Sequence, residues 1–133
     1  MTSMNKPSLW LTLQAHDAPA LIDFYVEAFG FTLSARYDEE GSDRVAHAEL
    51  LWPEGTGGLM MGSHKPGGEW VTQPGTAAAY VVVADPRALL ARIEAHGGAT
   101  VIRGITEQDY GSTEFAVADP EGNQWSFGTY AGA

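Results

Sequence analysis

The stretch Ala15–Gly30, AHDAPALIDFYVEAFG, has a counterpart 68 residues later in Val83–Gly98, VADPRALLARIEAHGG. In both stretches an aspartate, Asp17 or Asp85, precedes a proline, which is typical of a helix N-terminus. Apolar residues follow at helical spacing, and a glycine stands where each helix would end. The common offset indicates an internal duplication with one helix in each copy.

Predicted strands flank both helices. Residues 9–15 precede the first helix and alternate between a fully apolar face and a mixed face, as a half-buried strand does. Residues 77–83 hold the same place before the second helix. Three more strands are expected after each helix, at 31–37, 44–52 and 59–63 in the first copy and at 99–103, 112–118 and 123–129 in the second, with a loop at 104–111.

The order of one strand, one helix and three strands therefore occurs twice. A single helix covers only one face of four strands, so each copy needs the other to cover the rest. The sequence predicts an α+β fold of two tandem βαβββ modules forming a cupped mixed sheet around a shared cleft. We expect a single domain over residues 1–133, with module one at about 8–63, a glycine- and proline-rich linker at 64–75 and module two at about 76–130.

Composition narrows the classes of function. The chain has 17 acidic and 7 basic side chains, a formal net charge of −10, and no cysteine. This charge disfavours nucleic acid and anionic membranes as partners. It favours cationic or neutral ligands, although solubility alone is the simpler explanation. No apolar run is long enough for a signal peptide or a membrane span, so we expect a cytoplasmic protein.

The last predicted strand and the turn before it complete a set of motifs that resembles a known family. Asp119–Gly122 has the proline and glycine of a tight turn, and polar and aromatic residues alternate after it. With the duplicated helices, the sequence resembles the vicinal oxygen chelate superfamily, which includes glyoxalase I, extradiol dioxygenases, fosfomycin-resistance enzymes and bleomycin-resistance proteins. The resemblance covers roughly residues 8–130, and its motifs are Asp17, Leu21–Tyr25, Phe29–Phe31, Asp85, Gly97-Gly98, Asp119–Asn123, Trp125 and Phe127.

The resemblance implies paired βαβββ modules, usually in a dimer, and it also implies where a metal would be held. The metal enzymes of this family use side chains from the first and last strands of each module. The matching positions here are Trp10, Ala78 and Ser126, and residues 58–62 offer no carboxylate, histidine or amide. A divalent ion needs three or four nitrogen or oxygen ligands. We therefore expect no metal and no cofactor.

Strand alternation predicts which side chains face the cleft. In residues 44–52 the small apolar face that includes Ala46 suits helix packing, so Val45, His47 and Glu49 are expected on the opposite face. Met60 and Met61 are expected in the core. The expected ligand-binding residues are Trp10, Thr12, Gln14, His47, Glu49, Trp70, Tyr80, Tyr110, Glu114 and Ser126. Aromatic rings with a few polar groups are the usual lining of a small-molecule pocket.

Three of these residues are candidate catalytic groups. His47 and Glu49 have three alternative interpretations. They are a general base with the carboxylate that orients it, two ligands of an off-pattern metal site, or a solvated pair on a half-exposed strand. Glu114 is a candidate base or an ordinary surface acid. Trp10 lines the pocket or packs in the core.

Two functions from different classes fit these residues. The first is a metal-independent small-molecule-binding protein, similar to bleomycin-resistance proteins, that sequesters a cationic or aromatic compound such as an antibiotic. The alternative is a glyoxalase-like lyase or isomerase acting next to a carbonyl, with an off-pattern metal or a carboxylate base. A third possibility is a regulatory or interaction module. The expected partners are a small-molecule ligand and a second copy of the chain in a homodimer.

Overall fold

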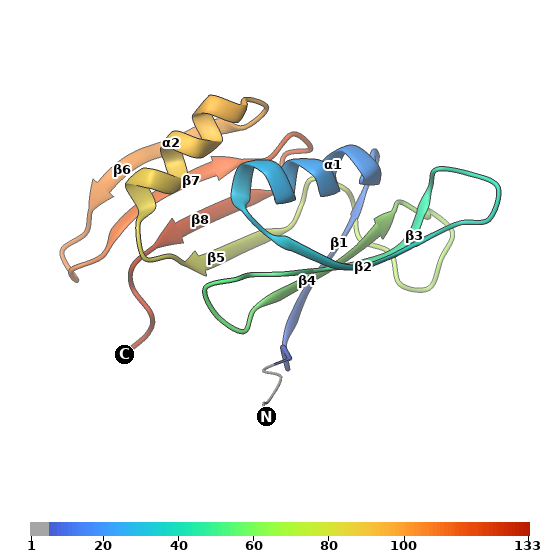
Figure 1. Ribbon diagram of the computed structural model, residues 1–133, viewed down its shortest axis with the longest axis horizontal. Helices are drawn as coiled ribbons and strands as arrows, with labels where there is room; N and C mark the ends of the chain where they lie inside the picture. The colour runs from blue at the N-terminus through green and yellow to red at the C-terminus, as the bar shows by residue number, and fades with distance from the viewer. Residues whose placement is uncertain (1–5) are drawn as a thin grey trace.

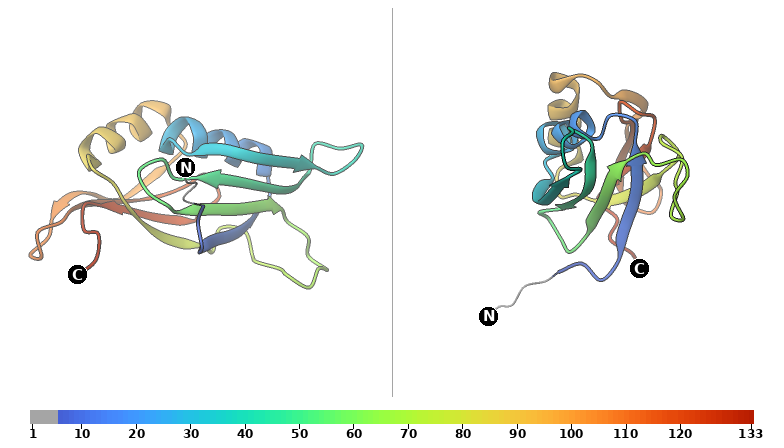
Figure 2. Two further views of the ribbon diagram at one scale, coloured as in Figure 1. Left: turned by 60° about the horizontal axis from the view of Figure 1, so that its bottom comes forward. Right: turned by 90° about the vertical axis from the view of Figure 1, so that its right-hand side faces the viewer.

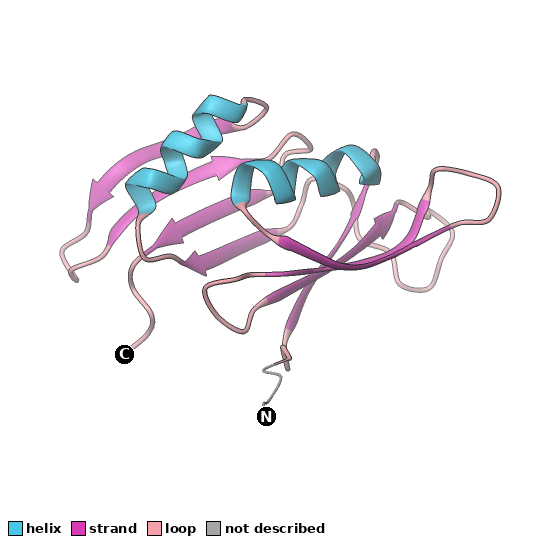
Figure 3. Cartoon of the chain, in the orientation of Figure 1, coloured by secondary structure: helices cyan, strands magenta, loops and turns pink. Residues whose placement is uncertain are grey.

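The computed structural model describes residues 6–133 and contains two modules with the same order of elements (Figures 1 and 3). The first module has β1 (Trp10–Ala15), α1 (Ala18–Phe24), the π-helical turn η1 (Tyr25–Phe29), β2 (Thr32–Asp38), β3 (Val45–Leu51) and β4 (Gly58–Ser63). The second has β5 (Ala78–Val82), α2 (Pro86–His96), β6 (Thr100–Glu107), β7 (Thr113–Ala118) and β8 (Gln124–Gly128).

Each module forms its own four-stranded mixed sheet. The strand orders are β1-β4-β3-β2 and β5-β8-β7-β6, so the first and last strands of each module lie side by side. These two pairs, β1 with β4 and β5 with β8, are parallel, and the remaining pairs are antiparallel. The predicted fold of two tandem βαβββ modules is confirmed. One boundary was wrong, because β6 continues to Glu107 through residues expected to form a loop, paired with the start of β7.

The two helices begin in the way the duplicated aspartates predict. The carboxylate of Asp17 accepts a hydrogen bond from the backbone N–H of Ala20 at 3.1 Å, and that of Asp85 accepts one from Ala88 at 3.0 Å. Each bond satisfies one of the N–H groups that a helix leaves unpaired at its first turn.

The helices lie next to each other along one face of the two sheets (Figure 2). Arg92 of α2 joins them, because its guanidinium donates to the backbone oxygens of Glu27 and Val26 in η1 at 3.0 and 3.3 Å. A Cβ on Gly30 would stand 3.0 Å from this guanidinium, and Gly30 also has a φ of 89°. The positive φ therefore favours glycine at the end of η1, and a side chain there would also displace the Arg92 guanidinium slightly.

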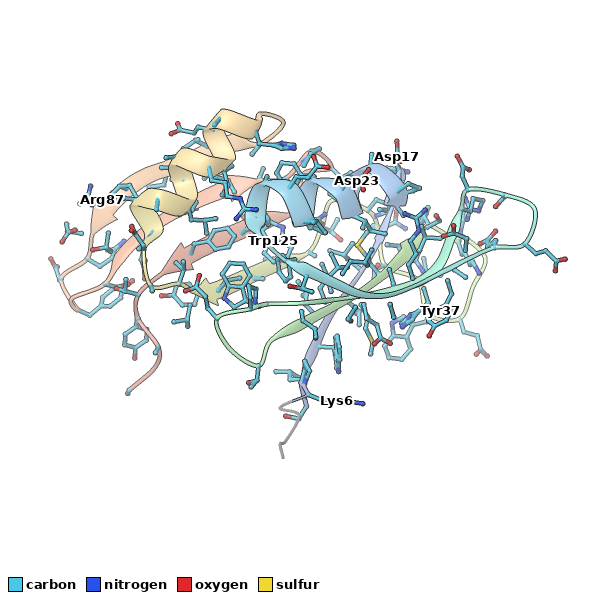
Figure 4. The ribbon with its side chains drawn as sticks, in the orientation of Figure 1. Lys6, Asp17, Asp23, Tyr37, Arg87 and Trp125 are labelled. Carbon is cyan, nitrogen blue, oxygen red and sulfur yellow. The ribbon has the colours of Figure 1, made fainter. Side chains whose placement is uncertain are left out.

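Aromatic rings from both modules form one core between the sheets and the helices. Trp125 of β8 lies near the centre of the molecule (Figure 4) and is 2% exposed. The centroid of its ring lies 5.2 Å from that of Tyr25 and 5.4 Å from that of Phe29. The ring centroids of Phe127, in the same strand, and Phe29 are 5.0 Å apart. The two modules thus share one hydrophobic core.

A buried carboxylate, Asp119, ties this core together from the turn before β8. It is 4% exposed and accepts hydrogen bonds from the Tyr25 hydroxyl at 2.6 Å, the Trp125 indole at 3.1 Å and the Asn123 amide at 3.0 Å. The backbone N–H groups of Glu121 and Asn123 also donate to it. These hydrogen bonds compensate for the removal of the carboxyl group from water.

A turn of each module also forms hydrogen bonds with the residues just before the helix of the other module. The carboxylate of Glu121, in the turn before β8, accepts hydrogen bonds from the backbone N–H groups of His16 at 2.7 Å and Asp17 at 2.8 Å, just before α1. Glu54, in the turn before β4, accepts one from Ala84 at 2.8 Å, just before α2. The two turns share a sequence motif, since Pro-Glu-Gly occurs at both 53–55 and 120–122.

Candidate functional site

The sheet faces opposite the helices contain two separate hollows, one in each module. The module-one hollow has a volume of about 320 Å³ and lies over β1, β3, β4 and the linker. The module-two hollow has a volume of about 500 Å³ and is lined by Tyr80, Tyr110, Glu114, Ser126 and Tyr130. The two hollows share no residue. They divide most of the predicted ligand-binding residues between them.

Gln14 of β1 fixes the linker over the module-one hollow. Its side-chain nitrogen donates to the backbone oxygen of Trp70 at 3.0 Å. Its oxygen accepts from the backbone N–H of Lys65 at 3.3 Å and lies 2.9 Å from Nδ1 of His64. One amide therefore holds both Lys65 and Trp70 of the linker, and it places Trp70, a residue that is 77% exposed, at the rim of the hollow.

His47 and Glu49 form a pair on β3 at the edge of this hollow. Nε2 of His47 lies 2.8 Å from Oε2 of Glu49, and both side chains are partly exposed. The Tyr37 ring stacks on the His47 ring with their centroids 6.4 Å apart. Figure 4 shows Tyr37 toward the outer end of β2. The arrangement gives module one an imidazole that is oriented by a carboxylate and flanked by an aromatic ring.

The side-chain alternation predicted for this strand was wrong at its start. Val45 is fully buried, and Ala46 is exposed and lines the hollow together with His47. The pairing register between β2 and β3 shifts between Tyr37 and Asp38, so alternation is interrupted there by a bulge. Met60 also lines the hollow instead of packing in the core, where Met61 lies as predicted.

Glu114 is the central group of the module-two hollow. Its side chain comes from β7 and the residue is 5% exposed, so the interpretation as an ordinary surface acid was wrong. The Tyr110 hydroxyl donates to its Oε1 at 2.9 Å, and the Tyr80 hydroxyl lies 3.3 Å from its Oε2. The Arg103 guanidinium lies 3.8 Å from Oε1, beyond hydrogen-bonding distance.

These neighbours set the protonation states in the hollow. Burial opposes ionisation of Glu114, but hydrogen bonds from Tyr110, Ser112 and Tyr80 and the charge of Arg103 together lower its pKa below the usual value. The pKa of Tyr80 is raised by burial and by Glu114, and that of Tyr110 is raised mainly by its hydrogen bond to Glu114. At neutral pH the hollow therefore contains one carboxylate and neutral phenols.

Gly128 of β8 makes this arrangement possible. It pairs with Glu114 across the β7–β8 ladder. A Cβ at this position would stand 2.6 Å from Cγ of Glu114 and 2.6 Å from the Tyr80 hydroxyl. Only a residue without a side chain lets the carboxylate and the phenol meet over the strand.

The structure places nine of the ten predicted ligand-binding residues at the two hollows. Thr12, Gln14, His47 and Trp70 line the first, with Glu49 beside His47, and Tyr80, Tyr110, Glu114 and Ser126 line the second. Trp10 lines neither, because its ring lies against Gly58. Tyr130 and Lys65 also line the hollows but were not among the predicted residues. The available signal was their place in the chain, since Tyr130 directly follows the last strand and Lys65 lies in the linker.

A third cavity, of about 320 Å³, lies where the modules meet and is mainly apolar. Leu11, Trp52, Tyr80 and Trp125 are among the residues that line it. Tyr80 therefore stands between this cavity and the module-two hollow.

The residues present do not fit a metal site of the kind the family resemblance implies. Within residues 6–133, no three His, Asp or Glu side chains lie close enough together to hold an ion. His47 and Glu49 are bonded to each other, and the matching positions Trp10, Ala78 and Ser126 supply at most a hydroxyl. No helix in this part of the chain has the length and apolar character needed to cross a membrane.

Comparisons with known proteins identify the family and support the fold. The model of the glyoxalase/bleomycin resistance protein/dioxygenase superfamily matches residues 8–127. An uncharacterised protein of Mycobacterium bovis is 33% identical over 92% of this chain and 83% of the relative. The crystal structure of TioX from a Micromonospora species has a TM-score of 0.74 and 26% identity, with 90% of this chain and 95% of TioX covered. The crystal structure of TnmS3, an antibiotic binding protein from a Streptomyces species, has a TM-score of 0.70 and 20% identity. The match covers 96% of this chain and 97% of TnmS3. The chain belongs to the glyoxalase/bleomycin resistance protein/dioxygenase superfamily.

Proposed function

We propose that this protein is a metal-independent small-molecule-binding protein that sequesters a cationic or aromatic compound such as an antibiotic. One observation supports this proposal above the others. Each hollow has an exposed aromatic residue in its lining, Trp70 at 77% and Tyr110 at 57% exposure, and a carboxylate held by hydrogen bonds, Glu114, lies in the module-two hollow. Exposed rings held in place by hydrogen bonds are suited to stacking on a flat ligand.

The chemistry of Glu114 favours binding over catalysis. A general base for a proton next to a carbonyl works best with a pKa near the operating pH. The pKa of Glu114 is lowered instead, its Oε1 already accepts a hydrogen bond from the Tyr110 hydroxyl, and the Tyr80 hydroxyl lies 3.3 Å from its Oε2. A carboxylate held in this way is suited to attracting a cation. The antibiotic-binding relative TnmS3 has the same fold, which supports a role of this type.

We also propose a homodimer in the cytoplasm as the working form. The sheet faces opposite the helices expose large side chains from both modules, including Tyr37, Tyr80 and Val82. A second copy placed over these faces would bury them and would bring two hollows together. Analytical ultracentrifugation at micromolar concentration tests this, and a monomer at all concentrations would contradict it.

Tryptophan fluorescence tests the binding function directly. The protein is titrated with planar aromatic compounds, cationic and neutral, with and without added zinc, nickel or manganese. We expect saturable quenching by some members of the panel, unchanged by metal and without turnover. Trp70→Leu should remove most of the quenching from ligands in the module-one hollow, and Trp10→Leu, outside both hollows, is its matched control.

A metal-free lyase or isomerase is the second candidate, because His47 lies 2.8 Å from Glu49 in the orientation of a general base with its carboxylate. Exchange of protons next to a carbonyl, followed by NMR in deuterium oxide with small α-hydroxyketones, tests this activity. Exchange lost in both His47→Gln and Glu49→Gln would replace binding with catalysis as the function.

A further inference from the structure

The module-two hollow has the composition of an aromatic cage. Three of its five lining residues are tyrosines, and they come from β5, from the loop between β6 and β7, and from the segment after β8. The rings of Tyr110 and Tyr130 meet at 5.4 Å with an angle of 77° between their planes, so they form two walls of a corner. A corner of perpendicular rings can present more than one π-face to a single group.

Hydrogen bonds hold this cage in place without a ligand. The Tyr80 hydroxyl donates to the backbone oxygen of Tyr130 at 2.9 Å, and the Tyr130 N–H donates to the Ser112 hydroxyl at 3.0 Å. The Tyr110 hydroxyl is bonded to Glu114. Each ring is therefore positioned through a polar contact of its own residue, which lowers the entropy cost of binding.

The electrostatics of the hollow select the charge of its ligand. Glu114 is 5% exposed, and the Arg103 guanidinium forms an ion pair with it at 3.8 Å, so a ligand cation would share this carboxylate with Arg103. The ring faces add further negative potential, and the chain as a whole has a net charge of −10. An anion would be repelled by the carboxylate, and an uncharged ligand would gain no attraction between opposite charges from it.

We propose that the module-two hollow is a binding site for an organic ammonium group, with Tyr80, Tyr110 and Tyr130 around the cation and Glu114 beneath it. This proposal rests on the small-molecule-binding function above and names the chemical group that module two recognises. The volume of about 500 Å³ accommodates an alkylated ammonium head with part of its substituent. The module-one hollow, with His47, Gln14 and Lys65, lacks such a set of rings around a buried carboxylate.

Choline and its uncharged carbon isostere, 3,3-dimethylbutan-1-ol, test the proposal with the full chain. The two probes have nearly the same shape, so their difference measures the contribution of charge. Binding is followed by NMR through the backbone amide of Gly128, which lies against Glu114. We expect millimolar binding of choline and binding of the isostere weaker by about tenfold.

Four variants locate the effect. Glu114→Gln should weaken choline binding about tenfold, and Tyr130→Leu, at a residue that is 42% exposed, about threefold. Arg103→Gln should strengthen it two- to threefold, because the competing cation is removed. Glu94→Gln on the exposed surface of α2 removes the same charge elsewhere and should leave the affinity unchanged.

Equal affinity for choline and its isostere, or choline affinity that Glu114→Gln, Arg103→Gln and Tyr130→Leu all leave unchanged, would overturn the proposal. If Glu114→Gln does not fold, Arg103→Gln and Tyr130→Leu still test the proposal. Failure of this proposal is separable from failure of the general function. Planar compounds that still quench tryptophan fluorescence would preserve the binding function, and an absence of binding to both classes would overturn both.

Discussion

The two modules have the same strand order and the same helix caps, yet their open faces differ in chemistry. The strand registers make Thr12 and Met60 of module one equivalent to Tyr80 and Ser126 of module two. Two residues further along the same strand, Gln14 of module one anchors the linker through its side-chain amide. Its equivalent in module two is Val82, whose side chain cannot form a hydrogen bond. Caps and turns therefore specify the shared backbone, and the side chains on the open faces are free to specify different ligands.

The same contrast appears at the turn that precedes the last strand of each module. The Pro-Glu-Gly turns align Trp52 with Asp119. Trp52 is an apolar anchor with one side-chain hydrogen bond, from its indole to the backbone oxygen of Val82 at 3.0 Å. Asp119 is a polar anchor that accepts bonds from several donors. The comparison predicts that module two is the more sensitive to loss of a single polar group.

Asp119→Ala should have the largest effect on stability. Removing this carboxylate leaves the buried Tyr25 hydroxyl and the Trp125 indole without partners and opens a polar gap in the shared core. We expect a loss of about 3–5 kcal/mol in the free energy of unfolding, measured by urea denaturation. Asp119→Asn keeps the shape and serves as the control, with a smaller loss. A loss below about 1.5 kcal/mol for Asp119→Ala would contradict the role of Asp119 as the anchor.

Glu121→Ala should have the next largest effect. One carboxylate accepts two backbone N–H groups, at His16 and Asp17, so its loss exposes both at the start of α1. We expect a loss of about 1–2 kcal/mol in the free energy of unfolding. Hydrogen exchange should show faster exchange of the amides at residues 16–20 than elsewhere in module one. Uniform acceleration over both modules would indicate a general loss of stability instead of a local one.

The comparison also shows which features a sequence can predict. The duplicated helices and their caps were predictable because Asp17 and Asp85 bond to residues only three positions away. The Pro-Glu-Gly contacts were not predicted, because Glu121 and His16 are 105 residues apart and no local rule relates them. Internal alignment of the two turns would have shown only that the Pro-Glu-Gly motif is repeated.

The candidate site was predictable to the extent that alternation holds along each strand. Alternation placed Tyr80, Glu114 and Ser126 on one face, where the structure brings them together. It failed at Val45 and Ala46, because a bulge shifts the register there. The burial of Glu114 depends on Gly128 across the ladder and on the Tyr110 hydroxyl, and neither contact can be read from residues 112–118 alone.

Tyr25→Phe should have a smaller effect, and one that depends on pH. Burial, with a further contribution from the charge of Asp119, raises the pKa of the Tyr25 hydroxyl well above its usual value. A raised pKa means that the folded state keeps this proton where the unfolded chain has lost it. The resulting stability is fully present below the unfolded pKa of about 10 and declines as pH rises above it.

We therefore expect Tyr25→Phe to cost about 1 kcal/mol at pH 7, for one lost hydrogen bond to Asp119. Above about pH 10 the original protein should lose stability more steeply than the variant, which narrows the difference between their free energies of unfolding. Urea denaturation at several pH values measures both quantities. Parallel curves for the two proteins would show that Tyr25 does not contribute to the alkaline loss of stability.

Glu54→Ala should have the smallest effect, and it completes the comparison with Glu121. Glu54 is exposed and accepts one backbone N–H, that of Ala84, where Glu121 accepts two. We expect a loss of about 0.5 kcal/mol in the free energy of unfolding, with faster amide exchange confined to residues 84–88 at the start of α2. Glu69→Ala, at an exposed linker residue, removes the same charge and is the matched control. If Glu54→Ala cost as much as Glu121→Ala, the number of bonds to the helix N-terminus would not set the strength of these contacts. The better explanation would then be that each Pro-Glu-Gly turn is held mainly by the buried residue before it, which is Trp52 in module one and Asp119 in module two.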